Sequence, residues 1–310
     1  MTFTEFAQSL GLIVGHCPAD GVWHRVKTQS HPHKRNGAFK LFPDGRIGYA
    51  QDHAAHPEPL RWQAGADVAL PKVDKAAIAR RQSEDRRTTM RAIAAARDYW
   101  RTCTPVRGHP YLSSHGLDMA GCSGLGTNLD GWLWVPAWKG QSLMSLQKIS
   151  PTGEKRYWPN APIGGAYHLL ERQNATITVL CEGLATGLAV FAACPAARVY
   201  VCFDAGNMAR VQIPLRGLAV VAADNDLATF DRLGRNPGLD AARAVSERTG
   251  CGIAAPEGIV GTDWCDFRME KRADAMARRG RFQSEGQVLK AVDEVIARDI
   301  SRAAKFVTAR

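Results

Sequence analysis

The chain has 310 residues, of which 45% are hydrophobic and 23% are charged, and its formal net charge is +10. This composition is typical of a globular protein with a buried core and excludes a disordered chain. No segment approaches the roughly 20 apolar residues of a membrane span, and no basic-flanked apolar run opens the chain, so we expect no membrane contact, no signal peptide and a cytoplasmic location. The eight cysteines form no C-x-x-C pair, which indicates small buried thiols in a reducing compartment.

Residues 1–70 form the first predicted domain, a small mixed module of helix and β-structure. Residues 3–13 have the apolar spacing of a short helix. Segments 37–42 and 46–51 flank Pro-Asp-Gly, which predicts a β-hairpin because proline presets φ and glycine accepts a positive φ. Aromatic and basic residues are interleaved around this hairpin, among them Trp23, Phe39, Tyr49, Trp62, Lys34 and Arg35.

These aromatic and basic residues leave two interpretations open. Single-stranded nucleic acid binding needs cations for phosphates and rings for bases, and Lys34 and Arg35 are candidates for it. Alternatively, the rings form the core of the small module itself. Zinc is disfavoured, because Cys17 and six histidines lie within residues 16–56 without the paired short spacing of tetrahedral zinc ligands.

Two further predicted domains follow in the middle of the chain. Residues 71–107 are a basic linker, rich in alanine and arginine and helical over 74–101. Residues 108–172 contain short apolar segments separated by glycine and proline turns, which predicts a compact antiparallel subdomain.

From residue 173 the pattern changes to alternating strands and helices. Near-continuous apolar runs at 177–181, 199–203 and 218–223, separated by helical segments, predict a parallel sheet covered on both faces. We therefore expect an α/β domain over 173–270, followed by a helical segment over 271–310. The predicted fold is a parallel sheet flanked by helices, preceded by a small mixed α+β basic subdomain and by an N-terminal module that contains a β-hairpin.

Acidic residues follow three of the predicted strands directly. Glu182 ends the first, Asp224 and Asp226 end the third, and Asp263 and Asp266 come after a weaker strand near 252–256. Ligands of such sheets gather beyond the carboxyl ends of the strands. Carboxylates that share that space repel one another unless a cation lies between them, and hard oxygen ligands suit Mg²⁺, with Mn²⁺ as the alternative ion. The other interpretation is a set of helix caps and exposed loop acids.

The motifs around these acids resemble the Toprim domain that topoisomerases and bacterial-type primases share. The resemblance is carried by Val179-Leu-Cys-Glu-Gly183, by Ala222-Ala-Asp-Asn-Asp226 and by Asp263-Trp-Cys-Asp266, and it is strongest with phage- and plasmid-encoded primases. Upstream, the segment 109–117 resembles the opening of the primase core, and 145–157 resembles its basic subdomain.

The resemblance implies roles for individual residues. Glu182 would act as a general acid/base or as a metal ligand, and Asp224 and Asp226 would hold Mg²⁺. In the basic subdomain, Lys148, Lys155 and Arg156 would face the nucleoside triphosphate or the template. The implied partners are a single-stranded DNA template, nucleoside triphosphates and a replicative helicase.

The chain departs from the family pattern in three places. Residues 227–237 intervene as a loop before the helix that follows the D-x-D pair, no N-terminal zinc ribbon is recognisable, and no G-x-x-x-x-G-K-[ST] motif occurs. The resemblance implies a DNA primase that makes short primers by Mg²⁺-dependent phosphoryl transfer in phage or plasmid replication. The alternatives are a metal-dependent endonuclease and a non-catalytic nucleic-acid-binding accessory protein. A topoisomerase is disfavoured, because 310 residues leave little room for a tyrosine-bearing cleavage domain.

Overall fold

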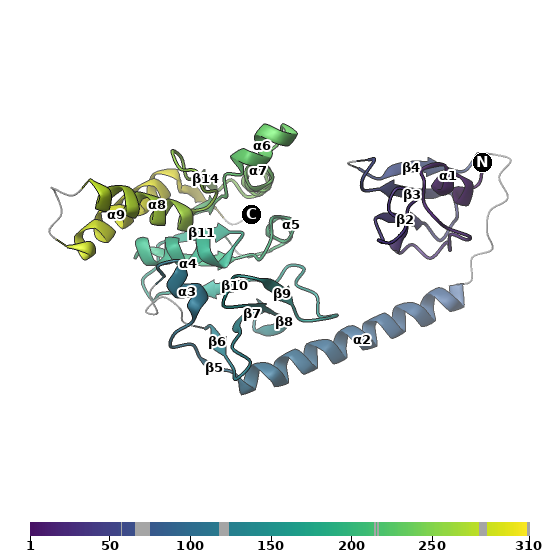
Figure 1. The fold of residues 1–310 in the computed structure, drawn as a ribbon. Helices are drawn as coiled ribbons and strands as arrows, with labels where there is room; N and C mark the ends of the chain where they lie inside the picture. Colours follow the sequence, from purple (N-terminus) through teal and green to yellow (C-terminus); the bar gives the residue numbers. More distant parts are fainter. Residues whose placement is uncertain are drawn as a thin grey trace. The chain divides into compact units, whose positions relative to one another are not determined.

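The computed structural model describes residues 1–56, 58–65, 75–117, 124–213, 215, 217–278 and 284–308. The chain divides into two compact units, Met1–Arg87 and Thr88–Arg310 (Figure 1). None of the helices in the described ranges combines the length and apolarity that a membrane span requires.

The first unit is a four-stranded antiparallel sheet with a helix against one face. Its elements, in chain order, are α1 (Phe3–Ser9), β1 (His24–Val26), β2 (Gly37–Leu41), β3 (Ile47–Asp52) and β4 (Leu60–Gln63). The predicted hairpin is therefore confirmed as β2 and β3. The helix is shorter than the predicted 3–13, because Gly11 adopts a positive φ of 81° and Leu12 pairs with Thr28 as an isolated bridge.

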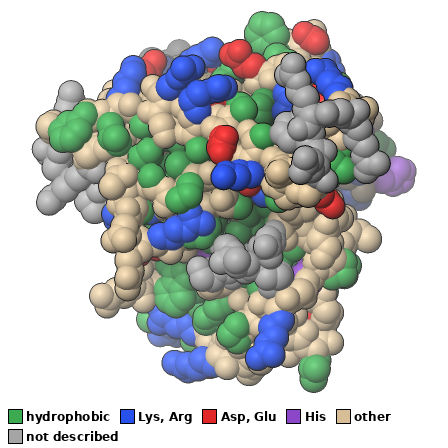
Figure 2. All heavy atoms as spheres, turned by 90° about the vertical axis from the view of Figure 1, so that its left-hand side faces the viewer, with side chains coloured by type: hydrophobic (Ala, Val, Ile, Leu, Met, Phe, Trp, Pro, Cys, Tyr) green, Lys and Arg blue, Asp and Glu red, His purple; other side chains and the backbone are tan. Residues whose placement is uncertain are grey.

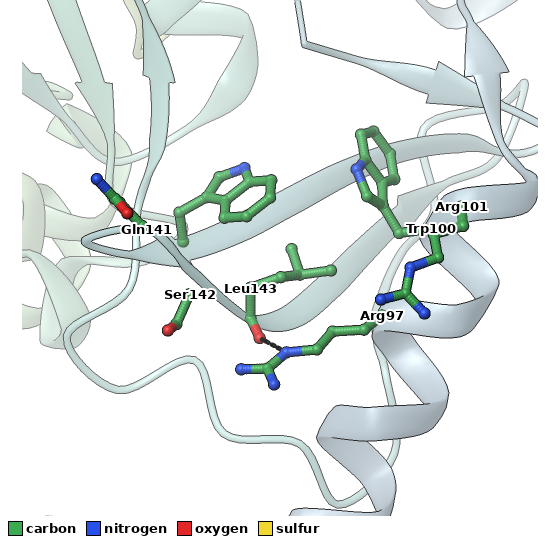
Figure 3. Close-up of a pocket in the computed structure, with 7 residues that line it drawn as sticks. Arg97, Trp100, Arg101, Gln141, Ser142 and Leu143 are labelled. Atoms are coloured by element: carbon green, nitrogen blue, oxygen red, sulfur yellow. Dashed lines mark hydrogen bonds between the residues drawn. The ribbon is translucent and has the colours of Figure 1, made fainter.

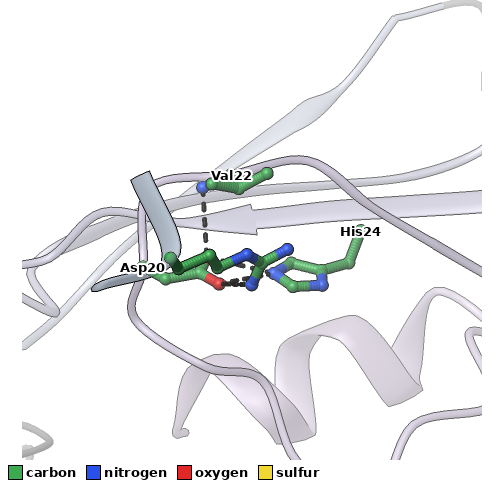
Figure 4. Close-up of polar contacts among 4 residues, drawn as sticks. Asp20, Val22 and His24 are labelled. Carbon is green, nitrogen blue, oxygen red and sulfur yellow. Dashed lines mark hydrogen bonds and ion pairs between the residues drawn. The ribbon is translucent and has the colours of Figure 1, made fainter. Parts of the chain in front are cut away.

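Helix α2 (Lys75–Thr102) follows and is long and rich in arginine, as expected. One of its arginines, Arg81, forms an ion pair with Asp20 of the first unit (Figure 4). Asp20 also accepts hydrogen bonds from the Val22 amide, at 3.1 Å, and from His24 Nε2, at 3.0 Å. Burial opposes ionisation of Asp20, but these donors and the Arg81 charge outweigh it and lower its pKa.

The second unit contains an antiparallel sheet in the order β5-β6-β7-β8-β9. Its strands, with the short helix α3, are β5 (Thr104–Pro105), α3 (Pro110–Ser114), β6 (Gly126–Thr127), β7 (Leu133–Lys139), β8 (Ser142–Ile149) and β9 (Lys155–Tyr157). The C-terminal end of α2 packs on this sheet, with Ala96 and Tyr99 against Trp134 and Leu146. The predicted antiparallel subdomain is present.

The second sheet of this unit has the order β10-β12-β11-β13-β14, with β15 paired to the first half of β13. Strands β12, β11, β13 and β14 are parallel, and β10 and β15 are antiparallel to their neighbours. The bounds of these strands are β10 (His168–Leu170), β11 (Ile177–Cys181), β12 (Ala197–Val201), β13 (Gly217–Ala222), β14 (Gly252–Ala254) and β15 (Lys305–Val307).

Helices cover both faces of this sheet. The helices are α4 (Leu184–Ala193), α5 (Ala205–Met208), α6 (Leu227–Leu233), α7 (Pro237–Thr249), α8 (Trp264–Ala277) and α9 (Glu285–Ala303). Alternate residues of β11 point to opposite cores: Val179 packs in the core that α4, α8 and α9 share, and Leu180 in the core of α5 and α7. The predicted α/β fold, a largely parallel sheet flanked by helices, is confirmed.

Three segments differ from the sequence prediction. The expected loop at 227–237 contains helix α6, which ends at Gly234 in the left-handed conformation, and Asn236 then caps α7. Helix α8 was not predicted, although Asp263 and Asp266 form its capping box. In the segment 271–310 that was expected to be helical, the last helix ends at Ala303, because the chain turns to pair β15 with β13.

Candidate active site

Acidic residues follow the ends of neighbouring parallel strands at one edge of the mixed sheet. Cys181, the last residue of β11, is in register with Val201 of β12 on one side and with Ala222 of β13 on the other. Glu182 follows Cys181 directly, and Asp204 and Asp224 follow the other two strands within three residues. The sheet register therefore carries these carboxylates to the same edge, as the sequence predicted for Glu182 and Asp224.

Burial and neighbouring carboxylates raise the pKa of two acids at this edge, Asp224 and Glu182. Burial, followed by the charges of Asp263, Glu182 and Asp226, raises the pKa of Asp224 to about 8. The Thr186 hydroxyl donates to Asp224 Oδ1 at 3.1 Å and offsets only part of that rise. For Glu182, burial and then the charge of Asp226 raise the pKa. An arrangement of this kind stores repulsion that a bound cation would relieve.

Asp263 and Asp266 have backbone partners at the start of α8. Asp263 Oδ1 accepts from the amides of Cys265 and Asp266, each at 2.8 Å. Asp266 Oδ2 accepts from the Thr262 amide at 2.9 Å and from the Asp263 amide at 3.3 Å. Burial still raises the pKa of Asp263, so these amides do not fully compensate for the loss of water. Both residues therefore act as helix caps, and Asp263 also adds its charge to the group around Asp224.

The carboxylates suit a divalent cation without forming a closed cage. Within the described ranges, no group of three or more His, Cys, Asp and Glu side chains converges on a single ion position. Mg²⁺ does not require such a group, since it keeps several waters and is commonly held by one or two carboxylates together with substrate phosphates. The donor chemistry of Glu182, Asp224 and Asp226 therefore fits a hydrated Mg²⁺, and the partial burial of these groups strengthens the attraction.

Strand β9 reaches this edge from the antiparallel sheet. The Tyr157 hydroxyl donates to the Phe203 carbonyl at 3.3 Å, directly before Asp204. The positive charge of Lys155 acts on Glu182, whose pKa it lowers against the larger effect of burial. Lys155 and Tyr157 are two apart on the strand and so share one face, which is the face turned toward the acidic edge.

Arg156 lies on the opposite face of β9. It pairs with Lys148 in the register of β8 and β9, and both cations lie near the Trp132 ring, at 4.3 Å for Lys148 Nζ and 6.0 Å for the guanidinium carbon of Arg156. Arg156 also forms an exposed ion pair with Glu154. Of the three predicted cations of this subdomain, the structure brings only Lys155 to the acids.

The other two predicted binding residues, Lys34 and Arg35, belong to the first unit. Both are exposed and precede β2. On the face of the molecule drawn in Figure 2, lysine and arginine side chains occur in separate groups in the upper, middle and lower parts of the surface, and acidic side chains lie mainly in the upper and middle parts. That face therefore does not collect the positive charge in one patch.

Sequence reasoning missed the residues that hold the D-x-D loop in place. Asn236, which is 5% exposed, donates to Asn225 Oδ1 at 3.0 Å and accepts from the Asp226 amide at 3.2 Å. A Cβ on Gly238 would lie 2.4 Å from the Asp224 carbonyl oxygen, so only glycine allows α7 to approach this closely. The Asn-Pro-Gly sequence at the start of α7 was the available signal, since Asn favours the N-cap and Pro the first helical position.

A separate pocket of about 310 Å³ lies where α2 meets the β7–β8 hairpin (Figure 3). Its walls come from Arg97, Trp100 and Arg101 of α2 and from Trp138 and Leu143 of the hairpin, with two further polar residues. Arg97 Nε donates to the Leu143 carbonyl at 2.9 Å, which fixes the helix end on the hairpin. None of the acidic candidates lines this pocket, so it is distinct from the carboxylate edge.

Comparison with known proteins identifies what the chain is similar to. Residues 177–274, which include all the acidic candidates, match the family model of the Toprim domain. The DNA primase TraC of Escherichia coli is 25% identical over 283 residues, a match that covers 80% of this chain and 19% of that protein. The chain thus spans a small part of the length of this relative. The crystal structure of the primase fragment of the bacteriophage T7 primase-helicase protein aligns with a TM-score of 0.38 and 11% identity, over 83% of this chain and 98% of that one.

Proposed function

Since residues 177–274 form a Toprim domain in a chain that resembles plasmid- and phage-encoded DNA primases, we propose that the protein is a primase-type nucleotidyltransferase. It would join nucleotides into short primers on a single-stranded DNA template during phage or plasmid replication. The observation that carries the proposal is the group of mutually repelling carboxylates at one sheet edge, with Lys155 of the antiparallel subdomain acting on the same group. A replicative helicase would be a further partner.

The proposal assigns roles to four of the candidate residues. Asp224 and Asp226 would hold Mg²⁺ or Mn²⁺, and Glu182 would share that task or act as general acid/base. A bound divalent ion would supply charge neutralisation at the reacting phosphates. Lys155 would contact the triphosphate, because it is the predicted cation whose charge acts on the acids.

Proton transfer falls to Glu182 in this mechanism. Burial and the charge of Asp226 raise the pKa of Glu182, which makes its carboxylate a stronger base, so Glu182 is suited to accept the proton of the primer 3′-hydroxyl. Thr186 keeps Asp224 oriented through its hydrogen bond, and Asn236 keeps the intervening loop in place. These contacts fix the acids on rigid elements, as phosphoryl transfer requires.

The test is incorporation of labelled nucleotides on single-stranded circular DNA with Mg²⁺ present or chelated. We expect incorporation by the wild-type protein, and its loss in Asp224→Asn and in Asp226→Asn without a fall in the melting temperature of either variant. Asp240→Asn is the matched control, since Asp240 lies on the exposed side of α7 in a surface ion pair with Arg243. Full activity in the Asp224→Asn/Asp226→Asn double variant would contradict the proposal.

The same assay distinguishes the two alternatives. Cleavage of the circular DNA without added nucleotides would indicate an endonuclease, because the same carboxylates can direct water instead of a primer hydroxyl to attack the phosphate. DNA binding with neither cleavage nor incorporation, under every metal condition, would indicate an accessory protein.

A further inference from the structure

The two faces of the β1–β4 sheet in the first unit differ in what covers them. One face is packed under α1, where the ring centroid of Phe3 lies 6.2 Å from that of Phe39 and 5.5 Å from that of Trp62. All three rings are buried. Two of the four aromatic residues around the hairpin therefore form the core of the module, and their role is structural.

Three other aromatic residues of the module, Trp23, Phe42 and Tyr49, lie on the opposite face. Tyr49 is adjacent on β3 to Ala50, which is buried in the core under α1. Neighbouring residues of a strand point to opposite faces, so the Tyr49 side chain points away from α1. Its ring centroid lies 6.5 Å from that of Trp23 and 6.3 Å from that of Phe42. Trp23 is 45% exposed, which is unusual for a residue this large and apolar. These three rings form a partly exposed row.

Cations flank this row in the same register. Lys40 of β2 is paired with Tyr49 of β3, which is paired in turn with Arg61 of β4, so the three side chains stand side by side across the strands. Lys40 Nζ lies 4.7 Å from the centre of the Phe42 ring. The face thus alternates rings and positive charges over three strands.

Among the described residues, neither Lys40 nor Arg61 forms an ion pair with an acid. Three acids are held by backbone amides of their own turns and caps: Glu5, Asp44 and Asp52. Asp20 is engaged by His24 and Arg81, and these are the ion pairs of this unit among the described residues. Lys40 and Arg61 are therefore available to an anionic ligand.

We propose that this open face, which we define as Trp23, Lys40, Phe42, Tyr49 and Arg61, binds single-stranded DNA by stacking bases on the rings and pairing phosphates with the two cations. The inference deepens the proposed function, since it assigns a template contact to a module outside the carboxylate edge. Unpaired bases are required, because rings on a flat sheet cannot reach bases that are stacked inside a duplex.

The experiment measures binding of a labelled 15-nucleotide oligo(dT) to the full chain by fluorescence anisotropy, in EDTA and without nucleotides. Binding is then read independently of catalysis. We expect Tyr49→Ala to weaken binding about 5- to 100-fold, the range for loss of one stacking ring. Tyr49→Phe keeps the ring and should bind like the wild type. Phe306→Ala is the matched control, because Phe306 is 74% exposed but lies on β15 of the second unit.

The cations are tested by the salt dependence of binding. Removing a phosphate contact to a single strand should reduce the slope of log K against log salt by about 0.7. We therefore expect a smaller slope in Lys40→Gln and in Arg61→Gln, and an unchanged slope in Arg302→Gln, an exposed cation on α9. A duplex of the same length should compete weakly.

Three results would overturn the inference: no binding by the wild type, equal affinity of Tyr49→Ala and Phe306→Ala, or equal competition by duplex. Retained melting curves exclude unfolding as the cause of a loss. Weakened binding in Tyr49→Ala together with no nucleotide incorporation by the wild type would leave this inference standing and refute the primase proposal. Nucleotide incorporation by the wild type together with unchanged binding in Tyr49→Ala would support the primase proposal and refute this inference.

Discussion

The raised pKa of Asp224 makes the stability of the protein depend on pH in a predictable direction. In the unfolded chain an aspartate has a pKa of about 4, whereas burial and neighbouring carboxylates raise the folded value to about 8. The folded state therefore holds a proton that the unfolded state releases. The contribution of this proton to the stability of the folded state is fully present below about pH 4 and is lost as the pH rises toward 8.

Replacing this carboxyl by an amide removes the effect. The free energy of unfolding falls by about 1.4 kcal/mol for each pH unit between the unfolded and the folded pKa, so the loss above pH 8 is at most roughly 6 kcal/mol. The Asp224 side chain keeps partial contact with solvent, which screens part of the repulsion, so we expect about 2–3 kcal/mol. Asp224→Asn should thus melt about 5–10 °C higher than the wild type at pH 9, at roughly 2–4 °C per kcal/mol for a unit of this size. The amide oxygen can still accept the Thr186 hydrogen bond.

The assay is thermal unfolding followed by circular dichroism from pH 5 to pH 9 in EDTA. The advantage of Asp224→Asn should grow with pH and level off above about 8. Added Mg²⁺ should raise the melting temperature of the wild type at pH 9 and have a smaller effect on the variant. Asp240→Asn controls for the change in net charge and should show no such trend. A difference between wild type and Asp224→Asn that is the same at pH 5 and pH 9 would refute the reasoning.

Three more predictions concern the surroundings of the site. Lys155→Gln should lower nucleotide incorporation at least tenfold more than Arg156→Gln, because only Lys155 acts on Glu182; comparable losses would contradict the assignment of the two faces of β9. Arg268→Met should reduce the free energy of unfolding by about 3–5 kcal/mol in urea, since it breaks an ion pair of 2.7 Å whose arginine is 6% exposed. Gly238→Ala should reduce kcat with the fold retained, because a Cβ there would displace the backbone of the D-x-D loop; wild-type kcat would show that α7 can shift without cost.

The order of strands and helices could be predicted because apolar runs report burial directly. The segments at 177–181 and 218–223 are fully apolar apart from Thr178, and both are central strands of the parallel sheet. Helix α6 has only seven residues, and Leu227 and Phe230 on it are exposed, so burial in the core does not account for it. It ends at Gly234, which has a positive φ of 69°, and Asp226 precedes it without a side-chain capping hydrogen bond.

The candidate site was predictable to the level of strand ends but no further. A carboxylate directly after a parallel strand must point to the carboxyl edge, so Glu182 and Asp224 could be placed from the sequence alone. The sequence could not show which cations lie near these acids. Their positions depend on the register between β8 and β9 and on contact between two separate sheets. Lys155 and Arg156 are adjacent in the sequence, yet they face opposite sides.

The same alternation separates the aromatic residues of the first unit into a buried set and a partly exposed set. Phe39 and Lys40 are neighbours on β2, and the pleat sends Phe39 under α1 and Lys40 to the other face. The two interpretations, core and binding surface, therefore apply to different residues rather than competing for the same ones. Burial of Phe39 and Trp62 gives the small sheet a core on one side, and that core is what leaves Tyr49 and Trp23 free to face a ligand on the other.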